Sequence, residues 1–182
     1  MKIGIFGGSF DPPHVGHEAI VNEALKKLDI DKLIIVPTFL SPFKHEFFLP
    51  PATRLELLTK LFSKDAKIEV SDYEVKQNRS VYTIETVKHF KKHYSCEKIY
   101  LIIGEDNLEK LHLWSEFERL NQMVEFVVAT RETQNNHPLL YANFKRLPID
   151  VDVSSTSIKQ DLDLNAIPNV IQNDLKTIIQ KV

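Results

Sequence analysis

The segment from Gly4 to His17 reads GIFGGSFDPPHVGH and contains the residue types best suited to binding phosphate. Four of the five glycines in the chain fall inside it, namely Gly4, Gly7, Gly8 and Gly16. Glycine permits sharp turns and lets a ligand lie directly against the backbone, because it has no Cβ atom. His14 and His17 are three residues apart, so in a helix they project from one face of the first turn. The segment therefore predicts a polyphosphate site.

Two elements are expected to position this segment. Lys2 to Phe6 is a short apolar run typical of a strand, and apolar residues recur at helical spacing from Ala19 to Leu28. The expected local structure is a strand, a glycine turn and the start of a helix. The bare N–H groups of Gly7 and Gly8 and the partial positive charge of the helix N-terminus would both attract an anion.

The rest of the chain alternates between strand and helix patterns. Apolar, β-branched runs occur at Ile3 to Phe6, Leu33 to Val36, Ile68 to Val70, Ile99 to Ile103 and Phe126 to Ala129. Helical patterns occur at Arg54 to Phe62, Tyr82 to Tyr94 and Pro168 to Val182, while Phe39 to Pro51 and Thr133 to Lys145 are expected to be mobile loops. Runs without polar alternation are typical of strands covered on both faces, so we predict a doubly wound α/β fold with a mainly parallel sheet.

Composition narrows the class of protein. The 182 residues include 43% hydrophobic and 26% charged residues, which suits one domain spanning residues 1–182. A formal net charge of −2 gives no global field for nucleic acid or an anionic membrane. No apolar run has membrane-spanning length, no signal-peptide pattern is present, and Cys96 has no partner for an internal disulfide. We therefore expect a soluble, cytoplasmic protein without nucleic-acid or membrane partners.

Further candidate residues follow other predicted strands, where open α/β sheets bind their ligands. The second strand leads into Pro37 to Lys44, and the fourth leads into Gly104, Glu105 and Asp106. A strand expected near Pro148 to Val153 leads into the cluster Ser154 to Ser157, with Lys159 one turn further on. Phosphate-binding chemistry is thus predicted at several strand ends of one sheet.

Each of these patterns also has a structural explanation. The two histidines of HVGH could be surface residues or half of a metal site, although no third ligand has a recognisable spacing. Ser154 to Ser157 could simply cap a helix, and Gly104 with Asp106 could form a tight turn instead of a ribose site. Trp114, the only tryptophan, could belong to the core or offer a flat face to an aromatic ring.

At these positions the chain resembles the bacterial nicotinate mononucleotide adenylyltransferases of the HxGH nucleotidyltransferase superfamily. GGSFDPPHVGH matches the family's GG(S/T)FDPxHxGH pattern, and VPTFLSPFK matches its proline loop ending in a basic residue. Arg54 with LELL, the EVKQNRSVYTIETV block, IIGEDNL and VSSTSIK match further motifs in the family's order. The resemblance spans roughly residues 2 to 160, which makes chance similarity a poor explanation.

The resemblance implies a Rossmann-like enzyme that condenses ATP with nicotinate mononucleotide in the presence of Mg²⁺, giving nicotinate adenine dinucleotide and pyrophosphate for NAD biosynthesis. Its implied catalytic residues are His17, His14 and Lys44. Its implied ATP-binding residues are Gly7, Gly8, Ser9, Phe10, Gly104, Asp106, Ser155, Thr156 and Lys159. Its implied nicotinate mononucleotide-binding residues are Tyr82, Thr83 and Trp114. The Mg²⁺ ion is expected to bind with the ATP phosphates and not to protein ligands. Formation of a homo-oligomer is possible.

The chain departs from the family pattern at one phosphate-binding position, and two alternative functions stay open. Lys159 stands where the family carries an arginine, so a planar fork is replaced by a point charge. The HxGH chemistry is also shared by enzymes with other acceptors, such as nicotinamide mononucleotide or phosphopantetheine. A non-catalytic module that binds ATP on the same fold is the alternative from a different functional class.

Overall fold

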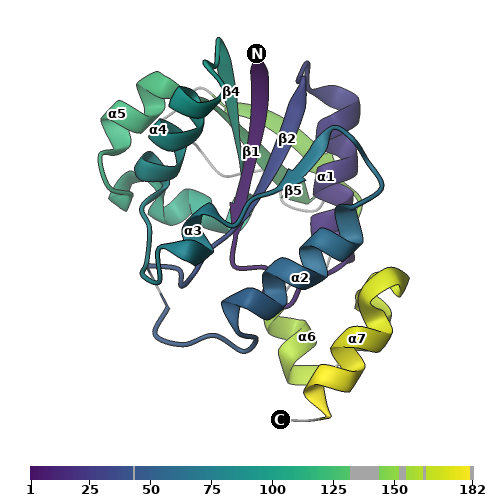
Figure 1. Ribbon diagram of the computed structural model, residues 1–182. Helices are drawn as coiled ribbons and strands as arrows, with labels where there is room; N and C mark the ends of the chain where they lie inside the picture. The colour runs from purple at the N-terminus through teal and green to yellow at the C-terminus, as the bar shows by residue number, and fades with distance from the viewer. Residues whose placement is uncertain (43, 132–143, 152–154, 162, 181–182) are drawn as a thin grey trace.

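The computed structural model describes residues 1–42, 44–131, 144–151, 155–161 and 163–180 (Figure 1). These residues form a six-stranded sheet in the order β3-β2-β1-β4-β5-β6, and every neighbouring pair is parallel. The strands are β1 (Lys2–Gly8), β2 (Lys32–Pro37), β3 (Ile68–Val70), β4 (Lys98–Gly104), β5 (Glu125–Arg131) and β6 (Phe144–Ile149). The predicted doubly wound, Rossmann-like fold is confirmed, since this strand order is characteristic of it.

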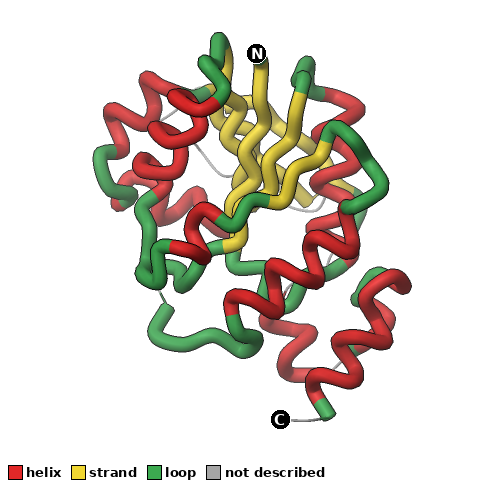
Figure 2. Tube along the Cα trace, in the orientation of Figure 1, coloured by secondary structure: helices red, strands yellow, loops and turns green. Residues whose placement is uncertain are grey.

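The helices connect successive strands and cover both faces of the sheet (Figures 1 and 2). Those before β5 are α1 (Val15–Lys27), α2 (Pro51–Phe62), α3 (Tyr73–Lys76), α4 (Thr83–His93), the 3₁₀ helix η1 (Glu105–Leu113) and α5 (Phe117–Met123). After β6 come α6 (Ser155–Asp161), the 3₁₀ helix η2 (Leu164–Ala166) and α7 (Asn169–Ile179). Within the described residues, no helix is long and apolar enough to cross a membrane.

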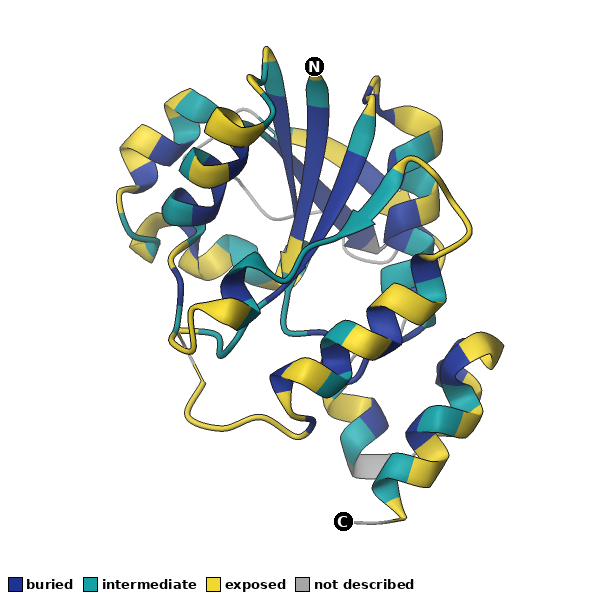
Figure 3. Ribbon diagram, in the orientation of Figure 1, coloured by how far each residue is buried: buried dark blue, intermediate teal, exposed yellow. Residues whose placement is uncertain are grey.

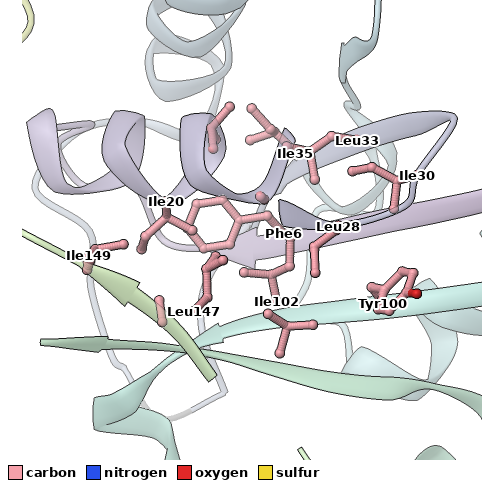
Figure 4. Close-up of a cluster of buried hydrophobic side chains, with 14 of the residues drawn as sticks. Phe6, Ile20, Leu28, Ile30, Leu33, Ile35, Tyr100, Ile102, Leu147 and Ile149 are labelled. Atoms are coloured by element: carbon pink, nitrogen blue, oxygen red, sulfur yellow. The ribbon is translucent and has the colours of Figure 1, made fainter. Parts of the chain in front are cut away.

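Alternating side chains of the central strands supply two apolar cores, one on each face of the sheet. Phe6 packs on the α1 side, close to Ile20 of that helix and Leu147 of β6 (Figure 4). Ile3 and Ile5 of the same strand point to the other face, where they join α4 and α5. The burial of both faces explains why the strand sequences are apolar without alternation (Figure 3).

A third cluster joins α2 to the C-terminal helices. It contains Leu57 of α2, Ile158 of α6, and Ile171 and Leu175 of α7, all of them buried. The predicted C-terminal helix is confirmed as α7, which packs beside α2 rather than directly on the sheet (Figure 1). This packing brings α6 to the same side of the molecule as the N-terminus of α2.

The predicted glycine turn after the first strand is wrong. β1 continues through Gly7 and Gly8, which pair with Val36 and Pro37 of β2, and no described glycine has a positive φ. The left-handed residue of the segment is Phe10, with a φ of 49°. The ladder hydrogen bonds of a central strand thus hold the glycines extended, and the turn follows them.

The last strand also lies earlier than predicted. β6 spans Phe144–Ile149, whereas the sequence suggested a strand near Pro148 to Val153 and a loop to Lys145. Lys145 and Arg146 are exposed while Leu147 and Ile149 are buried, because β6 is an edge strand that does not need a continuous apolar run. Residues 132–143 of the predicted loop lie outside the described residues.

Candidate active site

The candidate site lies at the carboxyl ends of β1 and β4, where the strand order of the sheet reverses. The loop from Ser9 to His14 leaves β1 here, and Gly104 ends β4 beside it. A Cβ atom on Gly8 would lie 3.2 Å from the ring of Phe10, whereas one on Gly7 would meet nothing nearer than the Val36 carbonyl at 4.0 Å. Gly7 therefore leaves open space at the strand end.

The two histidines of HVGH lie at the N-terminus of α1, as predicted. Their rings stack with centroids 3.6 Å apart, and Phe10 packs edge-on against His17 at 4.7 Å. The backbone N–H of His14 donates to Nδ1 of His17 at 3.1 Å. Because Nδ1 is an acceptor, the neutral ring of His17 carries its hydrogen on Nε2, which is then the group that can donate to a phosphate.

The environment of His17 keeps it neutral. Burial lowers its pKa well below the usual value, and the neighbouring His14 lowers it further. Loss of solvent and a second imidazole both disfavour the positively charged form, and the partial positive charge at the N-terminus of α1 acts in the same direction. In the absence of an anion, His17 is therefore a hydrogen-bond donor without a positive charge.

A pair of buried charges shapes the loops around the site. Asp11 and Arg54 are each 1% exposed. The Asp11 carboxylate accepts the N–H groups of Phe48 at 2.8 Å and Leu49 at 2.7 Å. The Arg54 guanidinium donates to backbone carbonyls of the loops after β1 and β2 and of the segment before α2. These contacts join three chain segments at one edge of the sheet.

The structure brings together the predicted phosphate-binding residues Ser9, Lys44 and Lys159. Nζ of Lys44 donates to Oγ of Ser9 at 3.2 Å, and Nζ of Lys159 lies 3.5 Å from Oδ2 of Asp11. Loss of solvent lowers the pKa of Lys44, and the charge of Lys159 lowers it further. Two ammonium groups thus lie close enough to repel each other, and a polyphosphate would relieve that repulsion.

Ser155, Thr156 and Ser157 of the predicted cluster form the start of α6. Oγ of Ser155 donates to the Pro12 carbonyl at 3.2 Å, which ties α6 to the β1 loop. Thr156 is exposed on the same turn, and Ser154 lies outside the described residues. The bond to Pro12 differs from a simple N-cap, in which the hydroxyl would accept from the helix backbone.

Gly104 and Asp106 meet at the junction of β4 and η1. A Cβ atom on Gly104 would lie 2.5 Å from Oδ1 of Asp106, so only glycine fits beside that carboxylate as it stands. Asn107 Nδ2 donates to the Gly104 carbonyl at 3.3 Å and to Asp106 Oδ1 at 3.2 Å. The carboxylate is thereby held at the strand end in a position that suits a ribose hydroxyl.

The three residues predicted to bind the nicotinate half lie at two places, the start of α4 and the end of η1. Tyr82 and Thr83 begin α4, and the Tyr82 ring is 51% exposed. Trp114 follows η1 and packs against the core on the α4 and α5 face, while part of it stays accessible. Trp114 is therefore a packing residue with a partly open face.

Asp11 and Arg54 shape the site but are not among the site residues predicted from the sequence. The helical pattern from Arg54 to Phe62 was correct, and the buried face of the resulting helix contains Arg54, Leu57 and Leu58. The helical spacing could have indicated that Arg54 is buried, because it lies four residues before Leu58 on the same face of the helix. A charged residue on a buried stripe indicates a network of partners.

Comparison with known proteins places the chain in a family. The sequence model of the family described as cytidylyltransferase-like matches residues 5–161. An Aliarcobacter butzleri protein described as a probable nicotinate-nucleotide adenylyltransferase is 51% identical over 175 residues, covering 96% of this chain and 95% of that protein. The chain belongs to this adenylyltransferase family. A Campylobacter jejuni member, described in the same words, is 47% identical over 182 residues, covering 100% of this chain and 98% of its own.

Solved structures with the same fold include more distant adenylyltransferases. The Plasmodium falciparum nicotinic acid mononucleotide adenylyltransferase complexed with NaAD has a TM-score of 0.78 at 22% identity, covering 97% of this chain and 95% of that chain. The same protein complexed with APC has a TM-score of 0.70 at 20% identity, covering 94% and 89%. At these identities the likeness shows the fold, which agrees with the strand order observed.

Proposed function

We propose that this protein transfers AMP from ATP to nicotinate mononucleotide, giving nicotinate adenine dinucleotide and pyrophosphate. Membership of the nicotinate-nucleotide adenylyltransferase family supports the reaction. The observation that carries the proposal is that His17, Lys44 and Lys159 each contact the loop after β1, at Phe10, Ser9 and Asp11 respectively. These groups can neutralise a triphosphate at the edge of the sheet where such folds bind nucleotides.

The reaction needs positioning and charge neutralisation more than a base. The phosphate of the mononucleotide is largely ionised near neutral pH and can attack without losing a proton to the protein. Its oxygen forms a bond to the α-phosphorus of ATP as the bond from that phosphorus to the bridging oxygen breaks, and pyrophosphate leaves with the electron pair. The protein must hold the two phosphates in line and stabilise the added negative charge.

The proposed catalytic roles follow from the geometry. Nε2 of His17 donates to an oxygen of the transferring phosphate, and stacking with His14 and the contact with Phe10 fix the ring. Lys44 and Lys159 bind the phosphates that leave as pyrophosphate, and Thr156 adds a hydroxyl donor at the start of α6. The Ser155 hydroxyl donates to the Pro12 carbonyl and so holds α6 beside the β1 loop. Asp106 accepts from the ribose of the adenylyl group beside Gly104.

We propose that Mg²⁺ enters with ATP. Among the described residues, no group of three or more His, Cys, Asp or Glu side chains is arranged to hold a metal ion. Both oxygens of Asp11 accept backbone N–H groups. Mg²⁺ is commonly held by substrate phosphates and water in nucleotide sites, where it neutralises charge on the phosphoryl oxygens. The nearby Lys44 and Lys159 would act on the same phosphates.

One set of assays tests both whether the protein is a catalyst and which acceptor it uses. Purified protein with ATP and Mg²⁺ is supplied with nicotinate mononucleotide, nicotinamide mononucleotide or phosphopantetheine, and pyrophosphate release is followed. The proposal predicts the highest kcat/KM with nicotinate mononucleotide. A higher value with another acceptor would reassign the substrate, and nucleotide binding without pyrophosphate from any acceptor would leave a binding module.

A further inference from the structure

Arg54 is a buried charged residue to which the proposed reaction assigns no role. Its guanidinium uses four of its five N–H groups, and every acceptor is a backbone carbonyl. The distances are 3.0 Å to Leu49, 2.6 Å to Ser9, 2.8 Å to Thr38 and 2.9 Å to Phe39. A guanidinium placed among carbonyls in this way fixes backbone, because each bond has a defined direction within one plane.

Three of the four carbonyls bracket the loop that carries Lys44. Thr38 and Phe39 lead from β2 into this loop, and Leu49 closes it before α2. The fourth acceptor, Ser9, belongs to the loop after β1. A single side chain therefore fastens both ends of the Lys44 loop to the segment that carries the serine hydroxyl.

Asp11 reinforces the second end of the loop. Its two oxygens accept the N–H groups of Phe48 and Leu49. Between the fastened ends, residues 44–48 are exposed to solvent (Figure 3). The separation of 3.2 Å between Lys44 Nζ and Ser9 Oγ thus depends on a loop held at its ends by buried bonds.

We propose that Arg54 is a positioning residue for Lys44, which it holds in line with the phosphates of ATP. This inference rests on the proposed function, in which Lys44 contacts those phosphates. A lysine at position 54 would keep the positive charge, but its three N–H groups diverge from one atom and do not span carbonyls on three segments. The loop ends would separate, and a displacement of about 1 Å at a catalytic group is enough to lower turnover by about 10²-fold.

A double-mutant cycle distinguishes positioning from a general structural role. The wild type, Arg54→Lys, Lys44→Ala and the double variant are compared in kcat with ATP and nicotinate mononucleotide. We expect Arg54→Lys to lower kcat by about 10-fold to 10²-fold in the wild-type background and by less than about twofold in the Lys44→Ala background. An equal reduction in both backgrounds would overturn the inference, because Arg54 would then act independently of Lys44.

Controls separate this inference from the proposed function and from instability. Leu57→Val, on the buried face of the same helix, is expected to lower Tm while kcat stays within about twofold of the wild type. Wild-type protein that releases no pyrophosphate would contradict the proposed function, whereas an active Lys44→Ala variant with wild-type kcat would overturn the positioning role alone.

If circular dichroism shows that Arg54→Lys is unfolded, Asp11→Asn serves as the second variant. Asp11→Asn keeps the shape of the side chain but replaces one acceptor oxygen with an amide group that donates. It therefore releases Phe48 or Leu49 from the loop anchor. The cycle with Lys44→Ala is then run with Asp11→Asn. A loss of kcat confined to the background that retains Lys44 is expected, and equal losses in both backgrounds would overturn the inference.

Discussion

The chemistry of the candidate site depends on how His17 is held. The hydrogen bond from the His14 backbone to Nδ1 selects the tautomer with hydrogen on Nε2. Burial and the stacked His14 ring favour the neutral form. His17 is therefore prepared to donate a hydrogen bond to a phosphate before any nucleotide arrives, and the negative charge of the bound anion then favours uptake of a proton from solvent by the ring.

Replacing His17 by alanine removes one donor to the transferring phosphate. By analogy with the loss of one donor that stabilises a transition state, we expect His17→Ala to lower kcat by about 10²-fold to 10³-fold. Circular dichroism should stay close to wild type, while Tm should fall modestly, because the variant loses the ring that accepts the His14 N–H and packs against Phe10. His93→Ala, an exposed residue at the C-terminal end of α4, is the matched control and should keep its kcat. Near-native turnover in His17→Ala would reject the catalytic role.

ATP should raise the pKa of His17. The pKa starts well below its usual value, and the negative charge of a triphosphate beside the ring favours the imidazolium. An NMR titration of the imidazole, with and without a non-hydrolysable ATP analogue, measures the shift. A pKa that is unchanged or falls on binding would contradict contact between His17 and the phosphates.

The elements around the site show which features a sequence can specify. Four apolar runs located β1, β2, β4 and β5, because strands buried on both faces need uninterrupted apolar residues. Ile68 and Val70 located the short edge strand β3, which is only half-buried. β6 was misplaced because Lys145 and Arg146 interrupt its pattern at the sheet edge. The roles of Asp11 and Arg54 were missed because their partners are backbone groups far away in sequence, which no local pattern records.

A side chain at position 104 should displace the Asp106 carboxylate at the junction of β4 and η1. Gly104→Ala would push its Cβ into the Asp106 carboxylate, so we expect KM for ATP to rise several-fold while KM for the acceptor changes less. Steady-state kinetics with each substrate varied in turn measures both constants. Gly4→Ala is the matched control, because its Cβ would meet Leu33 Cδ1 at 2.8 Å in the core and should change Tm instead. An unaltered KM for ATP in Gly104→Ala would exclude Asp106 from the ribose site.

At the scale of the whole molecule, we propose that residues 1–182 form one domain. The described helices pack on a single sheet or, in the case of α7, on α2, and α6 is tied to the β1 loop through Ser155. Stability and site geometry are therefore coupled, because the buried groups that hold the loops also belong to the folded core. Unfolding is expected to be one cooperative transition.

The stability of the molecule should fall as pH rises through the titration of Glu74. Burial raises the pKa of this carboxyl to about 7, and only its Oε1 has a partner, the hydroxyl of Thr86. Since an unfolded glutamate titrates at about 4.3, the folded state binds more protons between about pH 4.5 and about pH 7. The free energy of unfolding should fall by up to about 3 kcal/mol across that range.

Glu74→Gln should remove this loss of stability at higher pH. Urea unfolding at several pH values measures the effect, with Glu85→Gln as the control. Arg79 lowers the pKa of Glu85, so that carboxylate contributes stability that is present above its unfolded pKa and is lost as pH falls. A Glu74→Gln variant with the same pH slope as wild type would show that Glu74 ionises normally in the folded protein.

The central claim is adenylyl transfer to nicotinate mononucleotide, and the fate of labelled phosphate tests it most directly. Wild-type protein is incubated with nicotinate mononucleotide, Mg²⁺ and ATP that carries the label at either the α- or the γ-phosphate. The account predicts that α-label appears in the dinucleotide, that γ-label appears in pyrophosphate, and that the two products form in equal amounts. Transfer of γ-label to the acceptor, or release of inorganic phosphate without a dinucleotide, would contradict it.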